Sequence, residues 1–392
     1  MRTNYHFWVL ISIVAISGFS QGMLLPIIAV IFEQDGVSSS LNGLHATALY
    51  LGVLLASPFM EVPLKKWGYK PLILAGGFTV IASLMMFPLW KSFTFWFVLR
   101  LLIGIGDHML HFATQTWITS ASPKEKRGRN ISLYGLFFGI GFACGPFMTP
   151  LVETNESLPF IVSSLISLLA WLTVWGLKNE FPESSMETNS FFGSLHRFGN
   201  VMKFAWVALL PPFGYGFLEA SLNGNFPIYA LRSGITVETV SILLPAFAIG
   251  GIVFQLPLGM LSDRYGRPFV LLFAMAIGTV SFFSAEFIDS TIGLFIAFFV
   301  AGMVVGSTFS LGISYMADLL PKSLLPAGNI MCGMVFSIGS ILGPIIGGTV
   351  IQWNGSFFFM ISGMLFLIFL ALAFFQKQQR QEYAPRKKPL HG

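Results

Sequence analysis

The chain has 392 residues, of which 55% are hydrophobic and 10% are charged, whereas an ordinary soluble domain carries roughly a quarter charged residues. So few charged residues exclude a soluble globular protein, whose whole surface faces water. The net charge of +5 would suggest nucleic acid in a soluble chain, but here the basic residues lie between apolar runs, and we expect no nucleic-acid partner.

Apolar runs recur along the whole chain, separated by short polar breaks. A helix that crosses the bilayer core needs about 20 mostly apolar residues, and lipid offers no partner for exposed backbone polar groups, so each run is expected to be helical. We therefore predict an all-α membrane protein with twelve transmembrane helices, at residues 7–32, 41–63, 71–90, 94–118, 131–152, 159–177, 203–230, 240–261, 269–287, 291–317, 328–351 and 357–375.

The first run follows a basic residue, Arg2, as a secretory signal would. It has no small-residue cleavage site and continues to Phe32, so we interpret it as the first span. The two cysteines, Cys144 and Cys332, lie inside predicted helices. They provide neither a disulfide framework nor a metal-ligand spacing, and we expect no metal and no cofactor.

Basic residues lie mainly on one side of the predicted spans. With the N-terminus inside, the outer loops hold Lys91 and Arg232, and the other lysines and arginines of the loops fall inside. This asymmetry predicts an inner-membrane protein with both termini in the cytoplasm. We predict an N-terminal six-helix bundle at 1–177, a polar, flexible cytoplasmic linker at 178–202, a C-terminal bundle at 203–376 and a basic tail at 377–392.

The two halves of the chain match at an offset of 198 residues, which is the most informative feature of the sequence. This offset superimposes Gly68 on Gly266, Gly104 on Gly302, Pro123-Lys124 on Pro321-Lys322, Gly141 on Gly339, and Gly145-Pro146 on Gly343-Pro344. One offset that serves several regions implies duplication of a six-helix unit. Six spans per unit make the copies parallel repeats about an axis along the membrane normal.

Three motifs lie in defined spans: Arg100-x-x-x-Gly104-x-Gly106 in the fourth, Gly141-x-x-x-Gly145-Pro146 in the fifth, and Gly259-x-x-x-Asp263-Arg264-x-Gly266-Arg267 after the eighth. With the span count and the repeat, these motifs resemble the major facilitator superfamily, and within it the twelve-span drug/proton antiporters. The resemblance implies two pseudo-symmetric bundles that rock around a central cavity. It also implies a monomeric transporter that exchanges protons for a small-molecule substrate across the lipid bilayer.

The loop after the eighth span combines one acid with two bases. Asp263 can meet the positive end of a neighbouring helix dipole, and an arginine can meet a carboxylate. Our hypothesis is that Asp263, Arg264 and Arg267 latch the outward-facing state. The alternative is a tight turn whose charges only set topology. The first-half copy has Glu61 and Lys65 where the second has Gly259 and Asp263, a spacing that favours a local i,i+4 pair.

The glycines of spans 5 and 11, among them Gly141, Gly145 and Gly343, permit close helix packing. Pro146 and Pro344 remove a backbone donor and favour a bend. Both a gating role in alternating access and packing alone stay open for these residues.

Ionisable residues inside a membrane are costly and usually face a cavity. Arg100, Asp107, His111 and Gln115 fall on one face of the fourth span, at helical spacing. Our hypothesis is that Asp107 and His111 share a transported proton and that Arg100 serves as counter-ion. An internally neutralised structural cluster is the alternative. His108 points away from this face and is interpreted as a packed histidine.

The seventh span holds a second buried acid, Glu219, with Asn223 one turn later. Gly224 and Pro227 weaken the helix just beyond, which predicts a broken segment at a cavity. We assign substrate or proton binding to Glu219 and substrate binding to Asn223, Gln21 and Gln115. A structural pairing of Glu219 with another helix is the alternative.

The function predicted from these features is proton-coupled efflux of a small amphipathic or hydrophobic compound. A lipid or glycolipid flippase of the same fold is the alternative, and a non-transporting membrane receptor is a further one. An enzyme is disfavoured because the sequence has no phosphate-binding glycine loop, metal-ligand cluster or Ser/His/Asp arrangement outside the spans.

Overall fold

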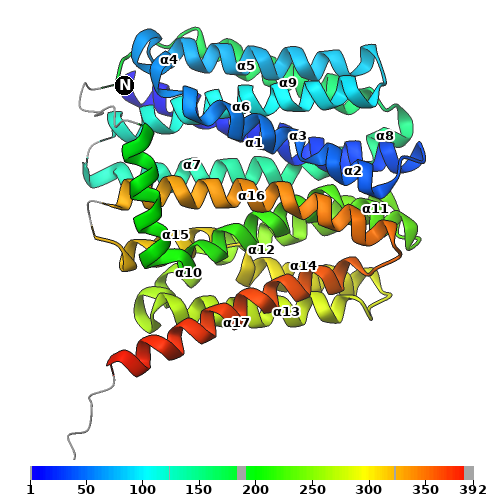
Figure 1. The fold of residues 1–392 in the computed structure, drawn as a ribbon. Coiled ribbons are helices and arrows are strands. Elements are labelled where there is room, and N and C mark those ends of the chain that lie inside the picture. Colours follow the sequence, from blue (N-terminus) through cyan, green and yellow to red (C-terminus); the bar gives the residue numbers. More distant parts are fainter. Residues whose placement is uncertain (1, 123, 183–190, 322–323, 384–392) are drawn as a thin grey trace, which may run out of the picture.

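A computed structural model describes residues 2–122, 124–182, 191–321 and 324–383 (Figure 1), and this part of the chain contains helices and no strands. The all-α prediction is therefore confirmed. Residues 183–190 of the predicted linker and residues 384–392 of the predicted tail lie outside the described part.

The first half of the chain forms nine α-helices and three short 3₁₀ helices. They are α1 (Arg2–Gln34), α2 (Ser39–Ala46), α3 (Ala48–Ala56), η1 (Ser57–Phe59), α4 (Glu61–Trp67), α5 (Tyr69–Met86), η2 (Phe87–Leu89), α6 (Phe93–Ala121), α7 (Lys124–Cys144), η3 (Gly145–Met148), α8 (Leu151–Thr154) and α9 (Leu158–Val174).

The second half forms fewer and longer helices. They are α10 (Phe191–Gly224), α11 (Phe226–Arg232), α12 (Val237–Tyr265), α13 (Arg267–Ala285), α14 (Thr291–Val305), α15 (Thr308–Leu319), α16 (Leu325–Gln352) and α17 (Phe357–Tyr383).

Ten helical segments of the described chain are long and apolar enough to cross a membrane. The two remaining predicted spans differ from expectation. The sixth is the shorter apolar helix Leu158–Val174, and the second is divided into α2, α3, η1 and part of α4. Pro58 in η1 and Pro63 in α4 lack the backbone N–H that a continuous helix requires. The break between α2 and α3 falls at Thr47, whose hydroxyl donates to the Leu44 carbonyl over 2.7 Å. By length and hydropathy, the count of twelve is thus confirmed only in part.

The same helix pairs pack together in each half, which gives the fold its pseudo-symmetry. In the first half α1 packs on α7, α3 on α6 and α5 on α9; in the second α10 packs on α16, α12 on α14 and α13 on α17. The halves form two layers in Figure 1, blue to cyan and green to red. The largest apolar core cluster comes from α10–α17, joined only by Ala29 from the first half.

Glycine contacts reproduce the 198-residue offset in three dimensions. A Cβ on Gly104 would collide with the Leu49 carbonyl oxygen, and a Cβ on Gly302 with that of Phe247. Gly141 meets the carbonyl of Ala15 in the same way that Gly339 meets that of Phe213. Both partners of each contact differ by 198, so duplication has preserved the closest backbone approaches of the bundle.

The turns that follow α4 and α12 are also equivalent. Gly68 and Gly266 have φ angles of 84° and 90°, which glycine adopts without a steric penalty. In the first half, the Tyr69 amide donates to the Glu180 carbonyl over 3.0 Å, and Trp117 Nε1 donates to Glu180 Oε2 over 2.7 Å. The start of the predicted linker is thus bound to the first bundle.

The predicted linker also contains a helical part. The chain is helical from Phe191 and kinks at Ala205, whose φ is −135°, and this first part of α10 crosses the end of the molecule that carries the N-terminus (Figure 1). Val201 and Ala205 are fully buried in the core of the second half. Burial of this apolar face explains why the last part of the predicted linker is helical. The domain bounds themselves stay a prediction.

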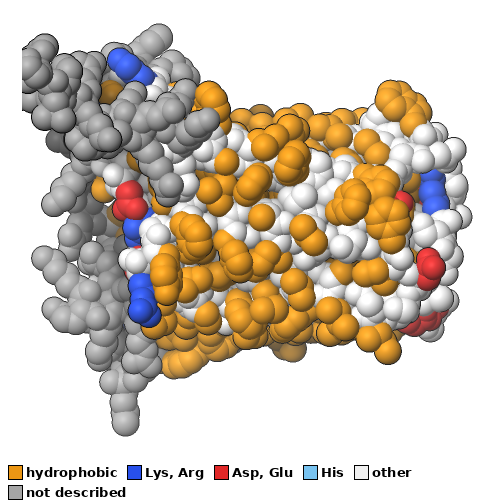
Figure 2. Space-filling view, turned by 90° about the horizontal axis from the view of Figure 1, so that it is seen from below, with side chains coloured by type: hydrophobic (Ala, Val, Ile, Leu, Met, Phe, Trp, Pro, Cys, Tyr) orange, Lys and Arg blue, Asp and Glu red, His pale blue; other side chains and the backbone are white. Residues whose placement is uncertain are grey.

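Figure 2 shows apolar side chains over the middle of one face of the molecule, with described acidic and basic side chains near its two ends. Leu256 and Met260 of α12, for example, are 74% and 73% exposed. An exposed apolar belt of this kind suits a lipid environment. The distribution confirms a multi-pass membrane protein.

Candidate functional site

The two halves are joined at the end of the molecule opposite the N-terminus, which we call the distal end. Arg232 Nε donates to Glu33 Oε1 over 2.7 Å, and the Ser39 amide and hydroxyl both donate to Gln352 Oε1 over 3.1 Å. A Cβ on Gly43 would collide with the Pro344 carbonyl oxygen. The structure is therefore a conformation that is closed at the distal end. There the backbone of Pro344 in the second half packs directly against Gly43 of the first.

Three other glycines have open space around them. A Cβ on Gly135, Gly259 or Gly333 would meet no atom within 4 Å. Gly135 lies in the middle of α7, Gly259 near the end of α12 and Gly333 in the first part of α16. Gly135 and Gly333 are again 198 residues apart. Glycine is not required at these places in this conformation, in contrast to Gly43.

A chain of hydrogen bonds joins α1, α6 and α7 in the first bundle. The Ser17 hydroxyl donates to Asp107 Oδ1 over 2.6 Å and lies 3.0 Å from His111 Nε2. His111 Nδ1 is 2.6 Å from the Tyr134 hydroxyl. With the proton of His111 on Nε2, every donor has one acceptor: Tyr134 donates to His111, His111 to Ser17, and Ser17 to Asp107. We call these four residues the relay.

Asp107 and His111 therefore lie together, as their spacing predicts, but Ser17 stands between them. Gln21 joins the same group because its Nε2 donates to Ser17 Oγ over 3.5 Å. Its Nε2 also lies 3.3 Å from His111 Nε2, but two N–H donors do not bond each other when the His111 proton is on Nε2. Sequence reasoning missed Ser17 and Tyr134. Ser17 lies one turn before Gln21 on the same helix face, which was an available signal; Tyr134 had none.

Arg100 lies apart from the relay, contrary to its expected role as counter-ion of Asp107. Its Nη1 is 3.0 Å from His45 Nδ1, while His45 Nε2 is 3.1 Å from the Phe93 carbonyl oxygen. His45 thus donates to Phe93 and accepts from Arg100. Seven residues separate Arg100 from Asp107, which is about 10 Å of helix rise, so a shared face did not bring them into contact.

Arg100 is 1% exposed, and its Nε and Nη2 have no hydrogen-bond partner within the described chain. Tyr50 of α3 lies within electrostatic range of both Arg100 and Glu219. Tyr50 therefore lies near both the buried cation Arg100 of the first half and the partly buried acid Glu219 of the second. Gln115, one turn beyond His111, is exposed, and His108 stacks near Phe112, with ring centroids 6.3 Å apart.

Glu219 lines a cavity between the two halves. The cavity has a volume of about 30 Å³ and is bordered from α7 and η3 by Phe142, Ala143 and Pro146, from α10 by Tyr215, Glu219, Leu222 and Asn223, and from α12 by Leu244, Phe247 and Ala248. Asn223 Nδ2 donates to the backbone carbonyl of Glu219 over 2.8 Å. This hydrogen bond does not involve the side-chain carboxyl group of Glu219. Across the residues described, no hydrogen bond or ion pair is made by that carboxyl group.

The helix break predicted beyond Glu219 is present, because α10 ends at Gly224 and α11 begins at Phe226. Asn225 lies at the break, and its Nδ2 donates to the Pro344 carbonyl over 3.2 Å. The break thus brings the end of α10 against the Pro344 region of α16 at the distal closure.

The charges of the loop after α12 are paired inside the second bundle. Arg267 contacts Asp318 over 2.7 Å and Asp263 over 3.2 Å, and Arg264 lies over the ring of Tyr265 at 5.4 Å. These contacts tie α12, α13 and α15 of one half together. All of these contacts lie within the second half in this conformation. The predicted latch between the halves therefore stays a prediction.

Within the described residues no group of three or more His, Cys, Asp or Glu could hold a metal ion. The site consists of the relay, the Arg100–His45 pair with Tyr50, and the unpaired Glu219 at the cavity between the halves. These groups can hold and pass protons and can bind a polar group of a ligand.

Comparison with known proteins gives one consistent result. The sequence-family model of the Major Facilitator Superfamily matches residues 10–229 and 208–391 of this chain. A protein of Bacillus subtilis (strain 168), named as the uncharacterized MFS-type transporter YfkF, is 59% identical over 372 residues, which cover 94% of this chain and 95% of that protein. The MFS-type transporter Ent638_1421 of Enterobacter sp. (strain 638) is 21% identical over 84% of this chain and 85% of its own.

Two kinds of solved structure are similar in fold. The nucleoside transporter NupG has a TM-score of 0.78 at 16% identity and covers 95% of this chain and 99% of its own. A bacterial homologue of the human lysosomal transporter Spinster, in an inward-facing and unoccupied conformation, has a TM-score of 0.73 at 15% identity and covers 98% of both chains. At these identities the likeness concerns the fold alone.

Proposed function

Because this chain belongs to the major facilitator superfamily of membrane transporters, we propose that it is a monomeric, proton-coupled exporter of a small amphipathic or hydrophobic compound. The transporter class is the premise, and the coupling, direction and substrate class are the proposal. The observation that carries it is the relay, in which Asp107, Ser17, His111 and Tyr134 form a continuous hydrogen-bonded path across three helices.

The relay supports proton coupling because each of its members can pass a proton to the next. Asp107 is 1% exposed, and the protonation of a buried carboxylate depends strongly on burial and on nearby groups. A change in how α1 and α7 sit against α6 alters both at once. Proton binding at Asp107 and the conformation of the first bundle are thus linked.

Substrate binding is assigned to the cavity at Glu219. The Glu219 carboxyl group makes no hydrogen bond within the described part of the chain and is bordered by the rings of Tyr215, Phe142 and Phe247. Such a site suits a ligand with one polar group on an apolar body. Gln21, Asn223 and Gln115 are further candidates for substrate contact. Glu219 lies in the second half and the relay in the first, so binding at one site is communicated to the other by movement of the halves.

The distal closure supports alternating access. We assign the distal end to the outside of the cell and the N-terminal end to the cytoplasm, following the positions of the basic residues. In this assignment the structure is an inward-facing conformation. The open space around Gly259 supports a second conformation in which another helix packs there and the loop of Asp263, Arg264 and Arg267 latches the N-terminal end. The motif of Gly141, Gly145, Pro146, Gly343 and Pro344 then acts as a hinge between the two.

The decisive experiment is a substrate screen with purified protein in proteoliposomes, with and without an imposed pH gradient. Lipophilic amines, neutral amphipathic compounds and nucleosides form the panel, the last because of the fold shared with NupG. We expect uptake of at least one amphipathic compound, unchanged chemically, at a rate that depends on the gradient. Uptake that ignores the gradient for every transported compound would overturn the coupling.

The same proteoliposomes separate the alternatives. Fluorescent lipids placed in one leaflet become accessible in the other if the protein is a flippase. A receptor binds a compound without moving it. Either result, in the absence of soluble-substrate flux, replaces the exporter proposal.

A further inference from the structure

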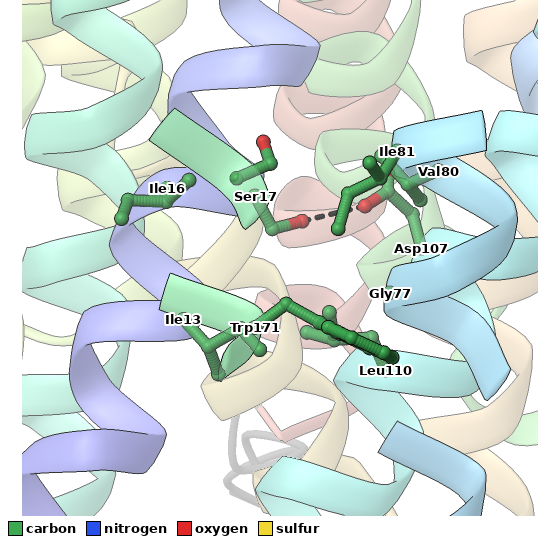
Figure 3. A pocket seen from close by; sticks show the side chains of 10 residues that line it. Ile13, Ile16, Ser17, Gly77, Val80, Ile81, Asp107, Leu110 and Trp171 are labelled. Atoms are coloured by element: carbon green, nitrogen blue, oxygen red, sulfur yellow. Dashed lines mark hydrogen bonds between the residues drawn. The ribbon is translucent and has the colours of Figure 1, made fainter. Parts of the chain in front are cut away.

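A small cavity lies inside the first bundle, away from the space between the halves. Residues of α1, α5, α6 and α9 border it, and Figure 3 shows Asp107, Ser17 and Trp171 around it. Its volume is about 20 Å³. The relay reaches Asp107 from the side of His111, whereas this cavity reaches it from the interior of the bundle.

One oxygen of Asp107 lacks a partner. Oδ1 accepts from Ser17, but Oδ2 is buried and makes no hydrogen bond to any described residue. Burying an acceptor without a partner is costly, and more so if the group is charged. The Gln21 amide also interacts with the Asp107 carboxyl group, but it makes no hydrogen bond to the buried Oδ2. Since Asp107 borders the cavity, a ligand there can be the partner of Oδ2.

A second hydroxyl borders the same cavity. Ser167 of α9 lines it and also meets the Ser20 hydroxyl at 3.2 Å, while Ser20 meets Ser163 at 2.9 Å. A ligand between Asp107 and Ser167 would thus connect the relay to a row of hydroxyls between α1 and α9. A hydroxyl can donate and accept hydrogen bonds, so these serines can bind a ligand that is a donor or an acceptor.

The size and lining of the cavity identify the ligand. A hard cation takes about six or more oxygens, but the lining carries oxygen-bearing side chains only at Ser17, Asp107 and Ser167. The rest of the lining is apolar or glycine, namely Ile13, Ile16, Gly77, Val80, Ile81, Leu110 and Trp171. A water molecule needs a volume of roughly 10–15 Å³ and at least two polar partners. The cavity meets both requirements.

We infer that this cavity binds one water molecule, which donates to Asp107 Oδ2 and bonds Ser167, and that Asp107 exchanges its proton through this water. Asp107 is then contacted on two sides, by the relay at Oδ1 and by the water at Oδ2. The proton pathway enters the first bundle between α1, α5 and α9, apart from the substrate cavity at Glu219. The water site stands by itself; its role in proton exchange rests on the proposed function.

The direct test is a density map of the whole protein in lipid nanodiscs at a resolution that reveals ordered water. One peak within hydrogen-bonding distance of Asp107 Oδ2 and Ser167 Oγ is expected. Ser167→Val, which replaces the hydroxyl by a methyl and adds another, removes the peak. Ser163→Ala is the matched control, because Ser163 bonds Ser20 without lining the cavity, and it leaves the peak in place. An empty cavity in the wild type overturns the inference.

A second readout is infrared spectroscopy of the Asp107 carboxyl band, identified by its loss in Asp107→Asn. The band shifts in Ser167→Val and stays fixed in Ser163→Ala. If Ser167→Val fails to fold, Val80→Ile narrows the cavity from α5 and produces the same shift. Unchanged bands in the folded variants contradict the water site. Neither measurement needs a substrate, so a missing water with gradient-driven flux refutes this inference alone, and a present water without any flux refutes the proposed function alone.

Discussion

The Ser17 hydroxyl lies 2.6 Å from Asp107 Oδ1 and separates the acid of α6 from the histidine one turn later on the same helix. A helix face alone would make Asp107 and His111 direct neighbours. The intervening hydroxyl changes their relationship, because a proton that moves between them has to pass through an atom contributed by α1. In the proposed relay, we therefore expect movement of α1 against α6 to open or close this path.

Ser17→Ala is expected to interrupt the relay without removing a titratable group. The variant leaves Asp107 Oδ1 without its donor, and the free energy of unfolding falls by about 1–3 kcal/mol. The gradient-driven component of substrate flux falls severalfold, while flux without a gradient is retained. Ser164→Ala is the control, since Ser164 is also buried and its hydroxyl donates to the Ile161 carbonyl of its own helix. Equal effects of the two variants on gradient-driven flux would contradict the relay.

Gly43→Ala is expected to open the distal end, because its Cβ collides with the backbone of Pro344, which cannot rotate away. Gly259→Ala is the paired control, since a Cβ there meets nothing in this conformation. A cysteine at Ala46, which is 2% exposed, reports the difference when Cys144 and Cys332 are replaced by serine. An impermeant thiol reagent added on the distal side labels it faster in Gly43→Ala and no faster in Gly259→Ala. The reverse order would show that this conformation has been assigned wrongly.

Glu219→Gln is expected to weaken substrate binding because it removes the unpaired acid of the cavity between the halves. For a cationic substrate, loss of a charge-assisted contact costs about 1.5–3 kcal/mol, which is a rise in KM of about tenfold or more. Glu238→Gln, at an exposed site near the start of α12, serves as the control. An unchanged KM in Glu219→Gln for every transported compound would remove Glu219 from the substrate site.

Lys91 joins two carboxylates of the distal loops, Asp35 at 2.7 Å and Glu156 at 2.8 Å. Partial burial acts to lower its pKa, but hydrogen bonds to Asp35 and Glu156 outweigh this and raise the pKa above the ordinary value of 10.5. A raised pKa in the folded state means that its contribution to stability is complete below the unfolded value and is lost as the pH rises through the folded value. The contribution is small because the side chain is 39% exposed.

The test compares the melting temperatures of the wild type and Lys91→Gln in detergent as the pH is varied. The difference between them is expected to be constant between about pH 6 and pH 9 and to shrink above about pH 11. A difference that is equally large at the alkaline end would mean that the charge of Lys91 does not supply it.

The fold was largely predictable because its signals are local or repeated. Span length and hydropathy identify most helices, and the 198-residue offset identifies the repeat that Gly104 and Gly302 reproduce as equivalent contacts. The division of the second span was missed, because an apolar run hides both the effect of Pro58 and Pro63 on the backbone and the break at Thr47. The helical start of α10 was missed because polar residues conceal the face that holds Val201 and Ala205.

The site was predictable only within single helices. The common face of Asp107 and His111 follows from helical spacing, but Ser17 and Tyr134 come from α1 and α7, and one sequence does not reveal which faces of separate helices meet. The same limit misplaced Arg100, whose partner His45 belongs to α2. Glu219 was identified because an acid in an apolar span is costly wherever it lies, and its cavity follows from the packing of α7 and α12 against α10.

The central claim is that Asp107 couples proton movement to transport, and it is tested most directly by flux into everted membrane vesicles. The wild type is expected to accumulate its substrate faster under an imposed pH gradient. Asp107→Asn, which keeps the size of the side chain, is expected to show one rate with and without the gradient, while Asp35→Asn retains the wild-type response. Asp107→Asn vesicles that still respond to the gradient as the wild type does would contradict the account.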